Sequence, residues 1–103
     1  MQTHPAKRVE IIIEEMMESR LCEALLKAGV KGFTVLPVHG GSGRSGHWTR
    51  AGQIGRAGGM RAVVCIVRPE ALDTLLNAAF SVVERHIGVV SIVDCEVLRA
   101  ERF

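Results

Sequence analysis

The stretch Met60–Val83, "MRAVVCIVRPEALDTLLNAAFSVV", decides the fold because an apolar strand passes directly into an amphipathic helix. Residues 60–67 are apolar and rich in valine, as is typical of a buried strand. Pro69 suits the first turn of the helix that follows. The inner stripe of this helix repeats at steps of three and four residues: Leu72, Leu75, Leu76, Ala79 and Val83. We expect the helix to end at Gly88 and a strand to follow over residues 89–98.

The first third of the chain repeats this order of elements. Alternating apolar residues predict a strand over residues 7–13, and an apolar stripe predicts a helix over residues 17–28. Gly29 stands where a left-handed residue would end that helix. A second strand is expected over residues 32–38. Pro37 cannot donate to a sheet ladder, so this strand is predicted to lie at an edge.

The two halves together predict an α+β fold, the ferredoxin-like βαββαβ sandwich. Two right-handed crossovers give a four-stranded antiparallel sheet with both helices on one face. The 103 residues suffice for one domain over residues 1–103. Four residues predict that the other face is also apolar in places, which favours self-association: Ile12, Val64, Ile66 and Val90.

A glycine-rich segment joins the halves. Residues 39–59, "HGGSGRSGHWTRAGQIGRAGG", hold eight of the eleven glycines, with arginines at 44, 50 and 56. We expect a long flexible loop without secondary structure, and connections of this kind are usually functional or disordered. The GxGxxG at residues 41–46 does not predict a Rossmann site, because no helix can follow it to hold a pyrophosphate. The segment contains no lysine, which excludes a Walker loop.

The residues of this loop leave three interpretations open. Backbone N–H groups exposed by glycines can form an anion site, which Arg44 could clamp and His39 could join. Alternatively, the arginines with Trp48 could form a platform for single-stranded nucleic acid. The loop could also be merely solvated.

Composition limits the other functions. A net charge of +2 is too small to indicate nucleic acid or a membrane surface, and no apolar run is long enough to span a bilayer. Three separated cysteines without CxxC spacing are typical of reduced thiols in a cytoplasmic protein. The four histidines show no ligand spacing, so no metal site is predicted. No nucleophile has a base placed by sequence, so we do not expect an enzyme.

Several stretches resemble the PII superfamily of trimeric signal-transduction proteins. The matching stretches are "KRVEIIIE", "ALLKAGVKGFTV", "VVCIVRPEALDTLL" and "GVVSIVDCEVLRAERF", with the Gly40-Gly41 pair after the second strand. The resemblance implies a homotrimer in which residues 39–59 are the T-loop, the arm that reports ligand state to a partner. It also implies that an adenine nucleotide, and no obligatory cofactor, binds in clefts between neighbouring subunits.

The resemblance assigns site residues by position. Thr34 and Val67 would lie near the adenine, and Arg99 and Arg102 would reach across from a neighbour. The ribose and phosphates would meet the loop base and the start of the last strand: Gly40, Gly41, Ser42, Gly43, Gly88 and Val89. His39 and Arg44, the candidate anion-site residues of the loop, complete the predicted nucleotide site.

Departures from the classical members indicate one branch of the superfamily. The chain has no tyrosine for uridylylation, and Val89 stands where a phosphate-binding lysine is expected. The short "HIGVV" loop resembles the PII-like branch associated with bicarbonate transport and carboxysomes. This resemblance implies AMP, ADP or cyclic AMP as ligand, with AMP or ADP favoured, and a transporter or carboxysome-related protein as partner. Candidate residues for a small anion such as bicarbonate are Gly41, Ser42, Arg44 and Arg50. A trimeric enzyme or metal-tolerance protein on a related scaffold would need a ligand cluster that the sequence lacks.

Overall fold

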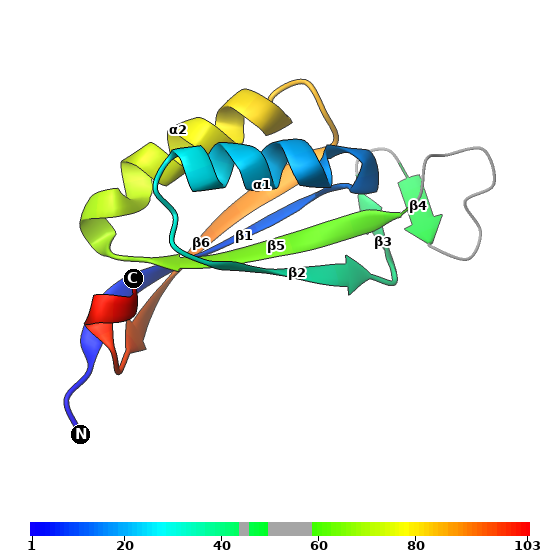
Figure 1. Ribbon diagram of the computed structural model, residues 1–103. Coiled ribbons are helices and arrows are strands. Elements are labelled where there is room, and N and C mark those ends of the chain that lie inside the picture. The colour runs from blue at the N-terminus through cyan, green and yellow to red at the C-terminus, as the bar shows by residue number, and fades with distance from the viewer. Residues whose placement is uncertain (44–45, 50–58) are drawn as a thin grey trace.

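A four-stranded antiparallel sheet carries two helices on one face (Figure 1). The computed structural model describes residues 1–43, 46–49 and 59–103. Its strands are β1 (His4–Glu14), β2 (Phe33–Val38), β3 (Gly40–Gly43), β4 (Gly46–Thr49), β5 (Met60–Val67) and β6 (Gly88–Val97). Its helices are α1 (Glu18–Lys27) and α2 (Leu72–Val83), with short 3-10 turns η1 (Glu15–Met17), η2 (Pro69–Ala71) and η3 (Ala100–Arg102). No helix of the described residues is long and apolar enough to cross a membrane.

Strand β1 lies inside the sheet and fixes its register. The order β2-β5-β1-β6 leaves β2 and β6 at the edges. Ile11 of β1 pairs with Val63 on one side and with Val90 on the other. The predicted ferredoxin-like topology is therefore confirmed, as is the edge position of the strand that contains Pro37.

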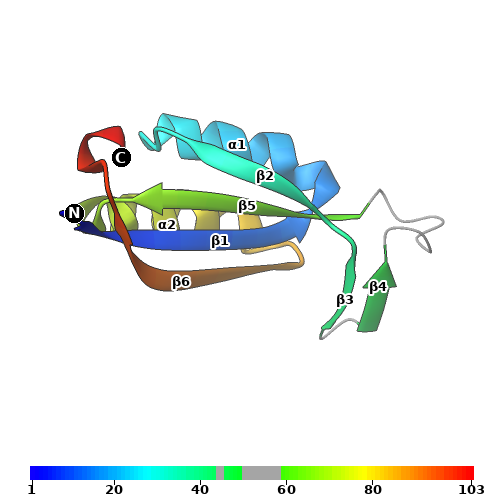
Figure 2. The same ribbon diagram turned by 90° about the horizontal axis from the view of Figure 1, so that it is seen from below.

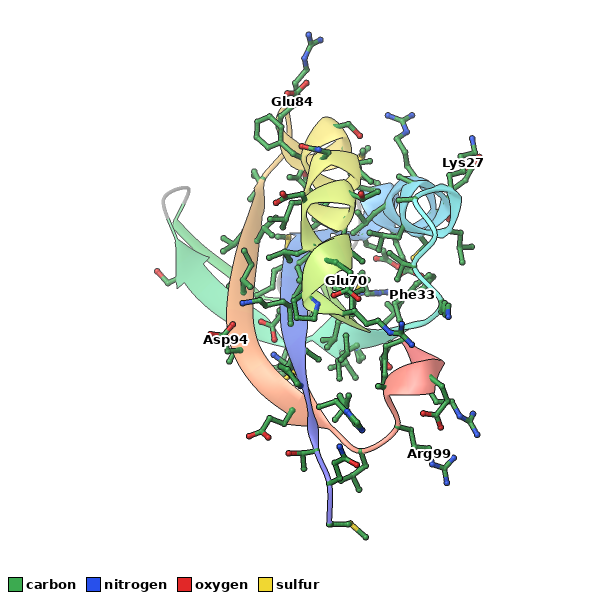
Figure 3. The ribbon with its side chains drawn as sticks, turned by 90° about the vertical axis from the view of Figure 1, so that its left-hand side faces the viewer. Lys27, Phe33, Glu70, Glu84, Asp94 and Arg99 are labelled. Atoms are coloured by element: carbon green, nitrogen blue, oxygen red, sulfur yellow. The ribbon has the colours of Figure 1, made fainter. Side chains whose placement is uncertain are left out.

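The helices α1 and α2 bury one face of the sheet. Figure 3, viewed close to the helix axes, shows them side by side on that face. Every second residue of β1 points into this layer, and Val9, Ile11 and Ile13 are fully buried. The helices contribute Leu21, Leu25 and Leu75, which are also buried. Gly29 has φ +88° and ends α1 as predicted.

The opposite face of the sheet is open along its length (Figure 2). Residues paired across strands share a face, so Ile12 lies there with Ala62 and Val89. Val64 and Ile66 lie there too, as predicted. The prediction for Val90 is wrong, because Val90 pairs with the buried Ile11 and packs against the helix-side core. At the centre of the open face Arg8 and Glu10 form an ion pair of 3.5 Å.

The structure corrects the predictions for three segments. The glycine-rich loop is not without secondary structure, because β3 and β4 pair as a two-stranded ribbon. Gly88 does not end a helix, since α2 ends at Val83 and Gly88 begins β6. The segment after the predicted last strand, for which no element was predicted, contains the turn η3. Glycine-rich strands and single turns carry little hydrophobic periodicity, which explains why the sequence did not reveal them.

The three cysteines are free thiols, as expected. Burial raises the pKa of the Cys65 thiol to about 11, with a smaller contribution from nearby Cys22. Burial, and then Glu18, raises the pKa of Cys22. Both thiols therefore stay protonated at neutral pH, which suits residues that pack rather than react.

An ion-pair cluster fixes the end of the glycine-rich segment to the start of α1. Arg61 donates to Glu15 at 2.6 Å and lies 3.3 Å from Glu18, and its side chain is only 15% exposed. Glu15 also accepts from the backbone N–H of Gly59 at 3.2 Å, and its own N–H donates to the Gly59 carbonyl at 2.9 Å. We call Glu15, Glu18, Gly59 and Arg61 the loop-root cluster. Side chains 46 residues apart in sequence meet here, so no local pattern predicts it.

Replacing Arg61 with methionine should lower the free energy of unfolding by about 1–3 kcal/mol, because two charge-assisted contacts are lost at a mostly buried side chain. The change is measured from urea unfolding midpoints. Lys27→Met is the matched control, since its ion pair to Glu23 is exposed and should be worth less than about 0.5 kcal/mol. Equal losses in the two variants would show that the loop-root cluster adds no stability.

Candidate functional site

Apart from Thr34, the predicted site residues that the structure describes fall into two groups at opposite ends of the sheet. At one end β2 leads into the glycine-rich loop, β5 begins and β6 begins, as Figure 1 shows. The loop-end group lies here, and its members are His39, Gly40, Gly41, Ser42, Gly43, Gly88 and Val89. His39 through Ser42 and Val89 are exposed to solvent. Arg44 and Arg50 lie outside the described residues, as does Arg56.

The second group lies at the end where the chain starts and finishes. Val67 ends β5, and Arg99 and Arg102 follow β6. Thr34, which we group with them, pairs with Val64 and so lies nearer the middle of the sheet, on the edge strand β2. We call this the tail-end group. An eight-residue strand such as β5 spans about 23 Å at 3.3 Å per residue. A single copy of the chain therefore does not bring the loop-end and tail-end groups together around one small ligand.

The two remaining residues of the tail-end group differ in what they can offer a ligand. Thr34 is exposed and pairs with Val64, so its hydroxyl lies on the open face of the sheet. The Val67 side chain is 5% exposed and belongs to the core between sheet and helices. Only the main chain of Val67 is thus available to a ligand at this strand end.

Gly88 has a packing reason to be glycine. A Cβ built there would lie 3.0 Å from the carbonyl oxygen of Ile12, 3.3 Å from the Ile13 Cγ2 atom and 3.7 Å from the Val83 Cβ atom. The close carbonyl belongs to the central strand and cannot move without disturbing the ladder. The tight approach keeps β6 against β1 where the predicted ribose and phosphate contacts begin.

Gly88→Ala should destabilise the fold by about 1–3 kcal/mol, because the added methyl group overpacks rigid backbone. Gly32→Ala is the control: nothing lies within 4 Å of a Cβ there, and its φ is not in the left-handed region. We expect the control to change stability by less than about 1 kcal/mol. Thermal or urea unfolding of the two variants measures these changes in stability. A Gly88→Ala variant as stable as the wild type would contradict the packing account.

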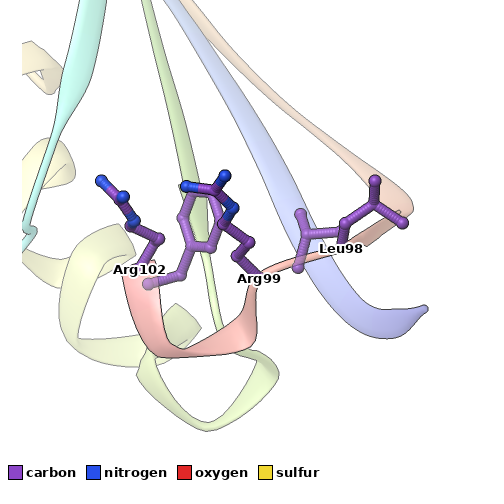
Figure 4. Close-up of a pocket in the computed structure, with 5 residues that line it drawn as sticks. Leu98, Arg99 and Arg102 are labelled. Atoms are coloured by element: carbon purple, nitrogen blue, oxygen red, sulfur yellow. The ribbon is translucent and has the colours of Figure 1, made fainter. Parts of the chain in front are cut away.

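Two arginines line an open pocket of about 480 Å³ beside the C-terminal turn. Its lining residues are Val97, Leu98, Arg99, Arg102 and Phe103. Figure 4 shows the side chains of Arg99 and Arg102 rising from the turn toward the same side. Within residues 1–43, 46–49 and 59–103, no carboxylate forms a salt bridge with either arginine. The pocket therefore combines an apolar wall with two positive charges, a combination that suits a phosphorylated ligand with an apolar part.

The sequence did not predict that Arg68 contacts the turn that carries these arginines. Its Nε and Nη2 atoms donate to the Ala100 carbonyl at 3.2 and 2.9 Å. The two residues are 32 positions apart, so the only available signal was an arginine immediately before Pro69. No group of histidine, cysteine or carboxylate side chains that could hold a metal ion occurs in the described part of the chain.

One solved PII-like protein with the same fold is described with bound nucleotides. CPII, a nitrogen regulatory PII-like protein from Thiomonas intermedia K12 bound to ADP, AMP and bicarbonate, is 28% identical with a TM-score of 0.89, over 99% of this chain and 96% of that chain. CPII bound to ADP and bicarbonate gives 29% identity and a TM-score of 0.85, over 99% and 97% of the chains.

A PII-like signalling protein from Thermus thermophilus gives 26% identity and a TM-score of 0.77, over 100% and 99% of the chains. A search of curated protein sequences finds no match. The family model described as "Nitrogen regulatory protein P-II" matches residues 6–102 of this chain. The sheet topology and the long segment after β2 agree with this match. The chain therefore belongs to the nitrogen regulatory protein P-II family.

Proposed function

We propose that this chain is a PII-like regulator that binds ADP or AMP between the subunits of a homotrimer. The observation that carries the proposal is the likeness, over 99% of the chain, to CPII bound to ADP, AMP and bicarbonate. The ligand would lie where the loop-end group of one subunit meets the tail-end group of its neighbour. Neither group alone surrounds a nucleotide, and their separation along β5 supports a site shared between copies.

The open face of the sheet supports self-association. Residues on this face are largely apolar and come from all four strands: Ile12, Leu36, Ala62, Val64, Ile66, Val89 and Val93. Leu36, Val89 and Val93 are between 46% and 61% exposed in the single chain. Burying this surface between copies would remove apolar area from water. We propose three copies because the sequence resembles a superfamily of trimeric signal-transduction proteins.

The chemistry of the proposed site favours short phosphate chains. Arg99 and Arg102 offer guanidinium groups, which bind phosphate oxygens with charge-assisted hydrogen bonds. The exposed main chain of residues 40–42 offers N–H groups at the loop base. Val89 adds no cation at the start of β6, so a third phosphate would have one partner fewer. We infer that ADP and AMP bind more tightly than ATP.

Ligand binding would be reported by the glycine-rich loop to a protein partner. Ordering of a segment by ligand contacts is a common way to alter a binding surface. A small anion such as bicarbonate would lie beside the nucleotide at Gly41 and Ser42, with Arg44 and Arg50 as further candidates outside the described residues. We propose a partner in inorganic-carbon uptake, either a transporter or a carboxysome-related protein. No chemical change of the ligand is part of this function.

ADP and AMP at millimolar concentration should raise the melting temperature, because a ligand that binds only the folded state stabilises it. Arg99→Ala and Arg102→Ala should each weaken ADP binding by about 1–3 kcal/mol, measured by calorimetry. Arg20→Ala removes an exposed arginine from α1 and serves as the control.

A rival single-strand nucleic-acid function makes opposite predictions. It expects indifference to free ADP and AMP, and oligonucleotide affinity that falls steeply with salt. A protein that remains monomeric, or that no adenylate stabilises, would contradict the proposed function.

A further inference from the structure

The turn η3, which carries the proposed phosphate-binding arginines, is too short to hold its shape alone. It has three residues, and its own hydrogen bonds are those from Arg102 N–H to the Arg99 carbonyl and from Phe103 N–H to the Ala100 carbonyl, both 3.1 Å. Isolated 3-10 turns have poor hydrogen-bond geometry and gain little order from their own contacts. The orientation of Arg99 and Arg102 therefore depends on a contact with the rest of the protein.

Arg68 makes that contact. Its guanidinium donates through two nitrogens to the Ala100 carbonyl, which also accepts from Phe103 N–H. Among the described residues, no other side chain outside the tail donates a hydrogen bond to residues 98–103. The carbonyl of the first residue of the turn thus joins η3 to the residue that follows strand β5.

The backbone of Arg68 is a rigid point of attachment. It precedes Pro69, and the proline ring restricts the preceding residue to extended geometry. Its φ of −66° and ψ of 150° fall in that region. Its carbonyl accepts from Ala71 N–H at 3.0 Å, and the neighbouring Val67 side chain is buried. The guanidinium therefore starts from a fixed position, and fewer torsions must be ordered to reach the turn.

The hydrogen bonds from Arg68 to the turn do not neutralise its charge. Arg68 binds a neutral carbonyl, and within the described residues neither it nor Arg99 nor Arg102 forms a salt bridge. The guanidinium of Arg68 is therefore engaged by the turn itself, whereas those of Arg99 and Arg102 are left to bind an anion.

We propose that Arg68 is a positioning residue for the nucleotide site. By holding the Ala100 carbonyl it fixes η3, so that Arg99 and Arg102 present their guanidinium groups to the phosphates of ADP in the neighbouring subunit's loop base. Arg68 itself does not line the pocket of Arg99 and Arg102. This inference rests on the proposed function and adds to it the residue that orients the arginines.

The first test compares ADP affinity of the full chain, wild type and Arg68→Gln, by titration calorimetry at fixed salt. We expect about a three- to tenfold loss, the size of coupling between residues in one hydrogen-bond network. Arg20→Gln is the control, since it removes the same charge from α1 and should bind ADP as the wild type does. Arg68→Lys keeps one donor and should retain part of the affinity; it also serves if Arg68→Gln does not fold.

The second test separates positioning from direct binding or a general loss of stability. In a background of Arg99→Ala and Arg102→Ala, Arg68→Gln should cause no further loss of ADP affinity, because there is nothing left to orient. Hydrogen exchange at the Phe103 amide should quicken in Arg68→Gln, while the melting temperature without ligand stays within a few degrees of that of Arg20→Gln.

The outcomes distinguish the two proposals. A wild-type protein that does not bind ADP overturns the proposed function and this inference with it. A wild type that binds ADP while Arg68→Gln and Arg20→Gln bind equally well overturns the positioning role alone. The positioning role is also overturned if Arg68→Gln lowers ADP affinity in the Arg99→Ala, Arg102→Ala background as much as it does in the wild type. Arg68 would then act on the ligand by itself.

Discussion

The antiparallel pairing of β1 with both of its neighbours is the constraint on which the rest of the structure depends. It aligns the end of β1 with the starts of β5 and β6, so the glycine-rich loop and Gly88 lie at the same end of the sheet. It also directs the end of β6 and residues 99–103 to the opposite end. The same pairing places Val9, Ile11 and Ile13 under the helices. Fold stability and the separation of the two residue groups therefore have one origin.

Long-range hydrogen bonds hold a surface segment at each end of the sheet. Arg61 and Glu15 hold Gly59 at the root of the loop, and Arg68 holds Ala100 in the C-terminal turn. In each case an arginine on or beside β5 makes the contact. Strand β5 is rigid because β1 and β2 pair with it on both sides. The sheet thus supplies fixed positions to segments that bury too little apolar surface to order themselves.

The sequence predicted the parts of the fold that periodicity controls. The strand at residues 60–67, the left-handed Gly29 and the edge position of Pro37 each follow from local chemistry, and the structure confirms them. Val90 was placed on the wrong face because a strand apolar on both sides carries no alternation to read. The β3–β4 ribbon, the loop-root cluster and the contact from Arg68 depend on residues that meet only after folding. Most residues of the candidate site were predicted from resemblance to a family. The structure adds which of them lie at the same end of the sheet.

The central claim is that one site takes residues from two copies of the chain, and subunit mixing tests it directly. Ser42→Asp places a negative charge in the loop-end group, and Arg99→Ala with Arg102→Ala removes the cations of the tail-end group. Each variant alone should lose most ADP affinity. When the two are unfolded and refolded together, each mixed trimer contains one junction with both sides intact, so near-wild-type affinity should return at about one site per mixed trimer. Mixed trimers that form but bind no more ADP than the separate variants would contradict a shared site.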